Sequence, residues 1–186
     1  MSAPISVIIP TLDAAGSLPA TLLSLMEGLD AGLICEVVVS DGGSQDATNI
    51  IAAAWGAEVI EGPASRGGQL RRGVVASRGK WVLALHADTV LQDGWSVEVK
   101  DRMHGGPLCF SLAYRAPGIA AKLVAAWANL RTDAMRLPYG DQGLLVRRKD
   151  YDIAGGYPEQ PLMEDVALIR SLALGTKRLR SRAFTN

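Results

Sequence analysis

The first ninety residues alternate between short apolar runs and segments with helical periodicity, and this alternation restricts the fold more than any other feature. The runs 5–10, 35–41, 57–62 and 80–88 are β-branched or continuously apolar. Between them, apolar residues recur three or four positions apart, as on one face of a helix. Continuously apolar strands are typical of parallel sheets covered by helices on both faces. Repeated strand–helix–strand units therefore predict an α/β fold with a mostly parallel central sheet flanked by helices.

The second half is less regular, but it also predicts helices and strands. The strand over 107–117 is expected at an edge of the sheet. In the first half, Ser44 is expected to cap the helix that follows it, and Gly175 is expected to end the last helix. The predicted elements of the second half are helices over 95–103, 118–137 and 163–175 and strands over 107–117 and 142–148.

The composition excludes several classes of function. Nineteen basic and nineteen acidic residues balance, so no broad field indicates a nucleic acid or an anionic membrane as partner. No stretch reaches the roughly 18 apolar residues of a membrane span, and the N-terminal run lacks the basic region of a signal sequence. We expect a cytoplasmic protein, with attachment at the surface of the inner membrane left open. Cys35 and Cys109 lie in apolar contexts and are expected to be reduced core thiols.

Polar side chains follow each of the four predicted strands of the first half. Open parallel sheets bind ligands at the carboxyl ends of their strands, so these side chains predict a binding crevice. Each has an ordinary explanation as well, and the segment 41–44 could be a plain turn with a helix cap. The residues in question are Thr11, Asp13, Asp41, Ser44, Glu61, Arg66, His86, Asp88 and Thr89.

Two common phosphate-binding motifs are absent from the sequence. The loop "PTLDAAGS" after the first strand lacks the dinucleotide pattern G-x-G-x-x-G, and no G-x-x-x-x-G-K-[ST] loop occurs. These absences argue against a dehydrogenase and a P-loop nucleotidase. A divalent metal between carboxylates and a diphosphate is the simplest phosphate-binding device for a neutral protein.

Three segments carry a resemblance to a known family. "SVIIPTLDAAGSLPATLLSL", "EVVVSDGGSQDAT" and "SRGKWVLALHADT" resemble family 2 glycosyltransferases of the GT-A fold, a Rossmann-like fold of nucleotide-diphospho-sugar transferases. The later "PYGDQGLLVRRKDYDIAGGYPEQPLMEDVALIRSL" resembles the acceptor half of that family. The whole pattern is most similar to a short bacterial subgroup named transferase 2, radical-SAM/selenodomain-associated. The resemblance covers nearly the whole chain and implies a single domain over 1–186.

The resemblance implies a donor half over 1–90 that binds a nucleotide-diphosphate sugar, most often a UDP-sugar. Asp41 would accept a hydrogen bond from the base, and Thr11 and Asp13 would border the nucleoside pocket. Arg66 would lie near the base or the diphosphate. Asp88 would hold a divalent metal, Mn²⁺ or Mg²⁺, on the diphosphate.

The same resemblance implies a catalytic and acceptor half over 91–186. Asp165, preceded by Glu164, would be the general base that takes a proton from an acceptor hydroxyl in one inverting displacement. The plainer alternative is that both acids complement the dipole at a helix N-terminus. Asp141 in "YGDQG" is the reserve candidate for the base, and its own plain alternative is a turn aspartate.

The sequence departs from the family pattern in three ways. His86 replaces the first acid of the D-x-D motif, and Arg71 or Arg72 replaces the usual asparagine before the fourth strand. No Q-x-x-R-W motif follows Asp165, which favours a single-addition transferase over a polymer synthase. His86 could ligate the metal, contact the diphosphate or fill space. Because an imidazole replaces an acid, we expect Mn²⁺ to serve better than Mg²⁺.

The acceptor is expected to contact residues 104–141, where Tyr139 and Trp127 could offer a stacking face. Core packing is the preferred interpretation of Trp127, because it lies on the stripe of the helix over 118–137. Two alternatives to a glycosyltransferase stay open: a nucleotidyltransferase of related architecture and a catalytically silent nucleotide-binding protein. The sequence names no sugar, no acceptor and no oligomeric state.

Overall fold

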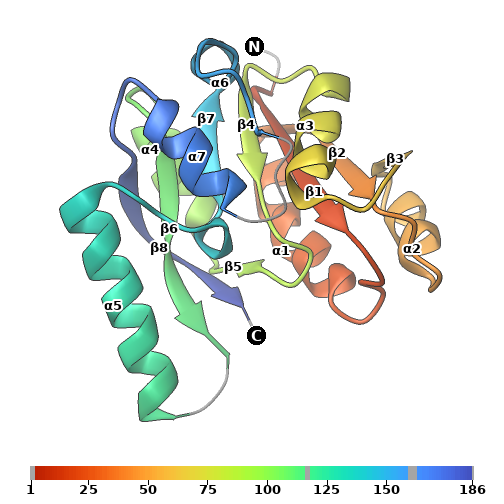
Figure 1. Ribbon diagram of the computed structural model, residues 1–186. Coiled ribbons are helices and arrows are strands. Elements are labelled where there is room, and N and C mark those ends of the chain that lie inside the picture. The colour runs from red at the N-terminus through yellow and green to blue at the C-terminus, as the bar shows by residue number, and fades with distance from the viewer. Residues whose placement is uncertain (1–2, 116–117, 159–162, 186) are drawn as a thin grey trace.

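One eight-stranded sheet with helices on both faces forms the protein, as the computed structural model shows for residues 3–115, 118–158 and 163–185 (Figure 1). The strand order is β3-β2-β1-β4-β7-β6-β8-β5. The strands are β1 Ile5–Thr11, β2 Ile34–Asp41, β3 Glu58–Glu61, β4 Trp81–Ala84, β5 Val90–Leu91, β6 Leu108–Tyr114, β7 Leu144–Arg147 and β8 Lys177–Thr185. The helices are α1 Leu18–Asp30, α2 Thr48–Ala54, α3 Arg66–Ala76, α4 Trp95–Arg102, α5 Ile119–Met135, the 3₁₀ turn η1 Gly140–Gln142, α6 Arg148–Ile153 and α7 Glu164–Ser171.

The four parallel strands that the sequence predicted are confirmed, although β4 ends at Ala84 and not at residue 88. Strand β1 lies between β2 and β4, and β3 lies outside β2, all four running in the same direction. The register pairs Thr11 with Asp41 and Asp41 with Glu61, so the polar residues after these strands reach one edge together.

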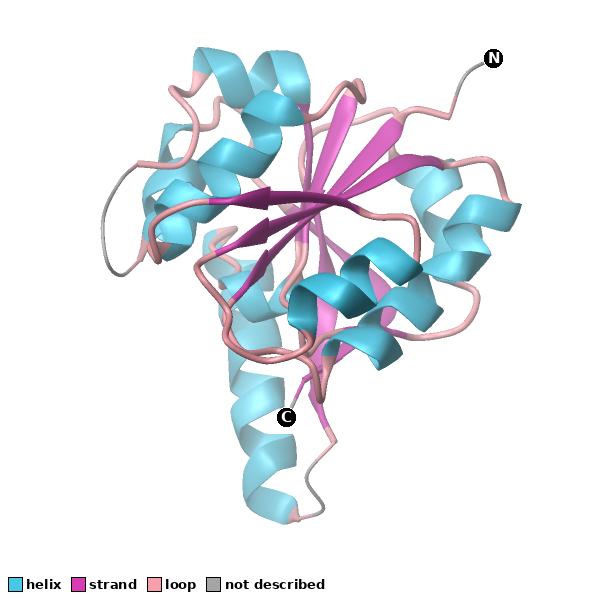
Figure 2. Cartoon of the chain, turned by 90° about the vertical axis from the view of Figure 1, so that its right-hand side faces the viewer, coloured by secondary structure: helices cyan, strands magenta, loops and turns pink. Residues whose placement is uncertain are grey.

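Alternate residues of β1 supply two cores, one on each face of the sheet (Figure 2). Val7 and Ile9 join the core with α1, α2 and α4, whereas Ile8 joins the core with α3, α6 and α7. Continuous apolar sequence is thus explained by burial on both faces. The side chain of Ser65 accepts a hydrogen bond from the backbone N–H of Gly68 and caps α3.

The second half of the sheet is mixed and differs from the prediction in two places. Strand β6 lies between β7 and β8 instead of at an edge. It runs antiparallel to β7 and parallel to β8, and β8 was not predicted at all. In β8 the buried Leu179 and Ala183 are separated by basic residues. The alternating pattern of this strand extends over few residues, so the segment resembles a polar tail.

Three further expectations are wrong. Ser44 does not cap α2, because its hydroxyl donates to Asp41 three residues earlier, and α2 begins only at Thr48. Helix α7 ends at Ser171, ahead of Gly175. Trp127 is not a core residue, since it is exposed on α5. Cys109 and Cys35 are free thiols, and burial raises the pKa of Cys109 to about 12, whereas Cys35 is half-buried.

We predict that Gly73→Ala destabilises the protein although alanine is normally the better helix former. A Cβ at Gly73 of α3 would lie 2.5 Å from Cγ2 of the fully buried Ile8. We expect a loss of about 1–3 kcal/mol, measured by urea unfolding, because the core must shift to admit the methyl group. Gly16→Ala is the control, since a Cβ at Gly16 would have no heavy atom within 4 Å. Equal stability of the two variants would contradict this close contact.

Candidate active site

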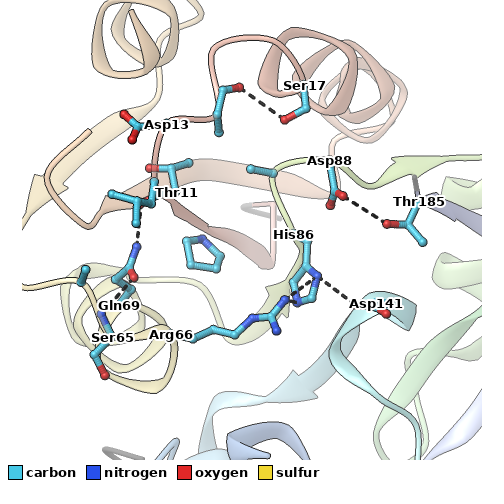
Figure 3. Close-up of a pocket in the computed structure, with 15 residues that line it drawn as sticks. Thr11, Asp13, Ser17, Ser65, Arg66, Gln69, His86, Asp88, Asp141 and Thr185 are labelled. Carbon is cyan, nitrogen blue, oxygen red and sulfur yellow. Dashed lines mark hydrogen bonds and ion pairs between the residues drawn. The ribbon is translucent and has the colours of Figure 1, made fainter. Parts of the chain in front are cut away.

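A cavity of about 860 Å³ opens where β1 and β4 end, beside the start of α3 (Figure 3). Thr185 at the end of β8 closes one side of it. Six of the predicted site residues line the cavity: Thr11, Asp13, Arg66, His86, Asp88 and Asp141. The other five, Asp41, Glu164, Asp165, Tyr139 and Trp127, are described by the structure but lie off its walls.

Asp41 is fully buried and is hydrogen-bonded to Thr11, which lines the cavity. Its carboxylate accepts hydrogen bonds from the Thr11 hydroxyl at 2.8 Å, from the Gly43 N–H at 2.8 Å and from both the N–H and the hydroxyl of Ser44. Burial acts to raise its pKa, but the hydrogen bonds from Ser44, Thr11 and Gly43 together hold the pKa below its ordinary value. With these donors in place, Asp41 shapes the turn after β2, and its contact with a base stays a prediction.

The loops after β1 and β2 are tied together at the cavity rim. Asp13 has a left-handed backbone with φ of 49°. Its carboxylate accepts from the Gln45 N–H at 2.7 Å, and its own N–H donates to the Ser44 hydroxyl at 2.8 Å. These reciprocal bonds fix one wall of the cavity before any ligand binds.

Gln69 is a site residue that the sequence analysis missed. It is buried on α3, and its amide donates to the carbonyls of Thr11 at 2.7 Å and Ser40 at 2.9 Å. The bonds attach α3 to the ends of β1 and β2. The available signal was a polar residue on the buried face of an apolar helical stripe, beside Leu70 and Gly73.

His86 stands between a cation and a carboxylate, as Figure 3 shows. Its Nδ1 lies 3.1 Å from Oδ1 of Asp141, and Nη2 of Arg66 lies within 2.9 Å of both ring nitrogens. Arg66 also reaches Glu164, with Nε 3.5 Å from Oε1. Arg66 therefore links α3, the end of β4 and the start of α7 across one side of the cavity.

Asp165 approaches the same cluster at Gly140. A Cβ on Gly140 would clash with the Asp165 carboxylate and lie 2.8 Å from Nε2 of His86. Only a residue without a side chain lets η1 enter between them. Burial, and next the charge of Glu164, raise the pKa of Asp165 to about 6, against the opposing effects of His86 and Arg66.

The two aspartates beside His86 are thus in opposite electrostatic situations. The hydrogen bond with His86 is the main cause that lowers the pKa of Asp141 below its ordinary value, with burial opposing it. Asp165, in contrast, is a buried carboxylate that can take a proton near neutral pH. Titratable groups whose environments separate their pKa values are suited to different acid–base roles.

Asp88 fits a metal ion better than His86 does. Its carboxylate lines the cavity, and from the described residues it accepts one long hydrogen bond, 3.3 Å, from the Thr185 hydroxyl. Both nitrogens of His86 are already contacted by Arg66, and Nδ1 is contacted by Asp141 as well. Within the described ranges, no three His, Cys, Asp or Glu side chains are placed to hold a metal ion by themselves. A metal here would need phosphate oxygens as further ligands, as Mg²⁺ commonly does.

Neither aromatic candidate lines the cavity. The ring of Tyr139 is half-exposed next to η1 and is covered by the Arg131 guanidinium at 3.4 Å from its centroid. Trp127 lies on the outer face of α5. No helix in the described parts of the chain is long and apolar enough to cross a membrane.

Residues 6–134 match the sequence pattern of the family described as glycosyl transferase family 2. The chain belongs to this family. Comparison with curated protein sequences gives no match.

The solved structures of this fold agree with the family. The S. aureus TarS fragment 1–349 is 20% identical with a TM-score of 0.71, and the match covers 100% of this chain and 60% of that chain. The complex of the same fragment with UDP-GlcNAc is 18% identical with a TM-score of 0.68, and the match covers 100% of this chain and 59% of that chain. Glucosyl-3-phosphoglycerate synthase from Mycobacterium tuberculosis, in complex with Mn²⁺, UDP and glucosyl-3-phosphoglycerate, is 22% identical with a TM-score of 0.67. The match covers 99% of this chain and 72% of that chain. The chain therefore has the predicted GT-A fold and spans about three fifths of TarS 1–349.

We predict that the raised pKa of Asp165 makes stability fall with pH. The pKa of an aspartate is about 3.9 in the unfolded chain, and that of Asp165 in the folded protein is about 6. The contribution of protonated Asp165 to the free energy of unfolding is therefore complete below about pH 4 and is lost as pH rises through about 6. Asp165→Asn removes this loss, and its gain over the wild type should be larger at pH 7.5 than at pH 4, by up to about 3 kcal/mol. Urea unfolding at both pH values measures it. A gain that does not change with pH would contradict the assignment.

Proposed function

We propose that this chain is an inverting glycosyltransferase that moves a sugar from a nucleoside-diphosphate sugar to an acceptor hydroxyl. The observation that carries the proposal is the buried Asp165 carboxylate, with a pKa of about 6, beside a cavity large enough for a nucleotide. Membership of glycosyl transferase family 2 supports it.

Residues 1–90 are proposed to bind the donor and residues 91–186 to supply the base and the acceptor side. TarS was crystallised with UDP and UDP-GlcNAc, and glucosyl-3-phosphoglycerate synthase with UDP and Mn²⁺, which supports a UDP-sugar as donor. The narrower similarity to the short radical-SAM/selenodomain-associated subgroup belongs to this proposal as well.

In the proposed reaction, Asp165 accepts the proton of the acceptor hydroxyl while the hydroxyl oxygen attacks the anomeric carbon from the face opposite the diphosphate. A base with a pKa near the working pH is effective because it is ionised yet still basic. A divalent metal held by Asp88 would neutralise charge on the leaving diphosphate. Asp141 keeps His86 oriented towards the cavity.

Arg66 is proposed to change partners when the donor binds. Its guanidinium now contacts the His86 ring and Glu164, and only the latter contact is an ion pair. A diphosphate offers a guanidinium two charge-assisted hydrogen bonds, with negative charge on both acceptor oxygens. Release of Arg66 would also free His86 for the diphosphate.

Two other functions are less well supported. Nucleotidyltransferases open with a glycine- and arginine-rich loop, whereas "IPTLDAAGS" has no arginine. Nucleotide binding alone does not require an environment that raises the pKa of Asp165. Residues with such shifted pKa values are concentrated at functional sites, which favours an enzyme over a silent binding protein.

Incubating the purified protein with a panel of sugar nucleotides and either Mn²⁺ or Mg²⁺ separates these functions. Slow hydrolysis that releases a nucleoside diphosphate supports a transferase. Release of pyrophosphate from a nucleotide and a sugar phosphate indicates a nucleotidyltransferase. Binding without any turnover indicates the silent protein.

We predict that Asp165→Asn abolishes turnover of the donor while donor affinity stays within a few-fold of the wild type. The amide is nearly isosteric but does not accept the proton. Calorimetry gives the affinity and the hydrolysis assay gives the rate. If turnover persists, the base lies elsewhere, and Asp141→Asn is then the variant to test.

We predict that Asp88→Ala abolishes metal-dependent donor binding and that His86→Ala weakens it by less. His86→Asp should improve the use of Mg²⁺ relative to Mn²⁺, because it restores a hard oxygen ligand. UDP affinity is measured for each protein with either metal and with chelator. Equal wild-type affinity with metal and with chelator would remove the metal from this site.

A further inference from the structure

Helix α5 turns small side chains towards the sheet and large apolar side chains away from it. Ala125, Ala128 and Thr132 are buried on the side facing β6 and β8. The large apolar residues are between 54% and 77% exposed, and they are Ile119, Leu123, Val124, Trp127, Leu130 and Met135. This arrangement is the reverse of the usual surface helix, whose apolar stripe faces the core.

Four of these residues form one continuous stripe along the helix. Ile119, Leu123, Trp127 and Leu130 follow each other at spacings of four, four and three, so they share one face. The helix lies at the margin of the fold, beyond β6 and β8 (Figure 1). Scattered apolar residues on a surface are ordinary, but a contiguous stripe of this kind marks an interaction surface.

The segments that contain α5 and β8 are rich in basic residues although the whole chain is neutral. Segments 115–136 and 177–185 contain eight basic residues and one acidic residue, leaving eleven basic and eighteen acidic residues elsewhere. The one acid, Asp133, is already paired with Arg178 at 2.6 Å. The basic residues are Arg115, Lys122, Arg131, Arg136, Lys177, Arg178, Arg180 and Arg182.

Two of these cations line a hollow beside the stripe. A cavity of about 460 Å³ lies between α5 and the strands β6 and β8, with Lys122 and Arg182 on its walls together with Tyr114 and Phe184. Cationic and apolar groups on one wall suit a phosphate ester that carries an apolar chain.

We propose that α5 docks on the surface of an anionic phospholipid bilayer. The stripe would lie at the boundary of the acyl chains, and the two cations of the neighbouring hollow, Lys122 and Arg182, would contact lipid phosphates. The charge decides between this partner and a second copy of the chain. A symmetric contact of α5 with itself would bring two such basic surfaces together, which opposes association. The proposal does not rest on the glycosyltransferase reaction.

Cosedimentation with vesicles tests the docking, using phosphatidylcholine alone or mixed with phosphatidylglycerol. The protein should bind the mixed vesicles at least about tenfold better, and added salt should reduce this binding. Leu123→Ser should lower binding by a similar factor. Leu23→Ser on α1 is the matched control, because the two leucines are 64% and 63% exposed. Lys122→Glu should also weaken binding, whereas Lys100→Glu, an exposed lysine of α4, should not.

Tryptophan emission gives a second readout at the stripe itself. Contact with mixed vesicles should shift the emission to the blue in the wild type, and Trp127→Phe should remove the shift while Trp55→Phe keeps it. Circular dichroism checks that each variant is folded, which their exposed positions favour. Equal binding of Leu123→Ser and Leu23→Ser would overturn the proposal, as would no preference for phosphatidylglycerol. A dimer in sedimentation velocity that Leu123→Ser dissociates would assign the stripe to a second copy instead.

Discussion

The buried amide of Gln142 holds η1 in place, and the position of η1 determines how Asp141, His86 and Asp165 meet. Its Nε2 donates to the carbonyl of Phe110 at 3.1 Å, and its Oε1 accepts from the Thr132 hydroxyl at 2.9 Å. A buried amide without such partners would cost about 1–3 kcal/mol, so the two contacts specify one placement. Because η1 carries Gly140 and Asp141, this network joins β6 and α5 to the end of β4.

That placement separates two aspartates that would otherwise be alike. Asp141 lies where His86 stabilises its charge, and Asp165 lies where burial and Glu164 oppose its charge. The guanidinium of Arg66 contacts both His86 and Glu164, and its positive charge offsets part of the repulsion between the Glu164 and Asp165 carboxylates. The Glu164 carboxylate is thus the anionic partner of Arg66 in this structure. An anion that draws Arg66 away would change the pKa of Asp165 and the freedom of His86 together.

The sequence predicted the edge of the sheet where the cavity lies, because neighbouring parallel strands bring their carboxyl ends together. The sequence did not predict that Asp41 would be enclosed by its own turn. An aspartate at the end of a strand has the same sequence pattern whether its carboxylate faces a ligand or Ser44. Gln69 and Gln142 were missed for a related reason. A glutamine is ordinarily a surface residue, and only three-dimensional contacts distinguish one that anchors a helix from one in water.

Helix α5 shows the opposite kind of failure, in which a correct period led to the wrong face. The stripe through Leu123 and Trp127 was assigned to the core because apolar residues usually face it. Ala125 and Ala128, one step round the helix, let α5 approach the sheet more closely than large residues would.

The neutral composition was misleading in the same way. Equal totals of acidic and basic residues exclude a field over the whole molecule, but they leave room for a basic region wherever the acids are concentrated elsewhere. In this chain the segments that contain α5 and β8 hold eight of the nineteen basic residues and one of the nineteen acidic residues, so a local excess of positive charge is compatible with a neutral total.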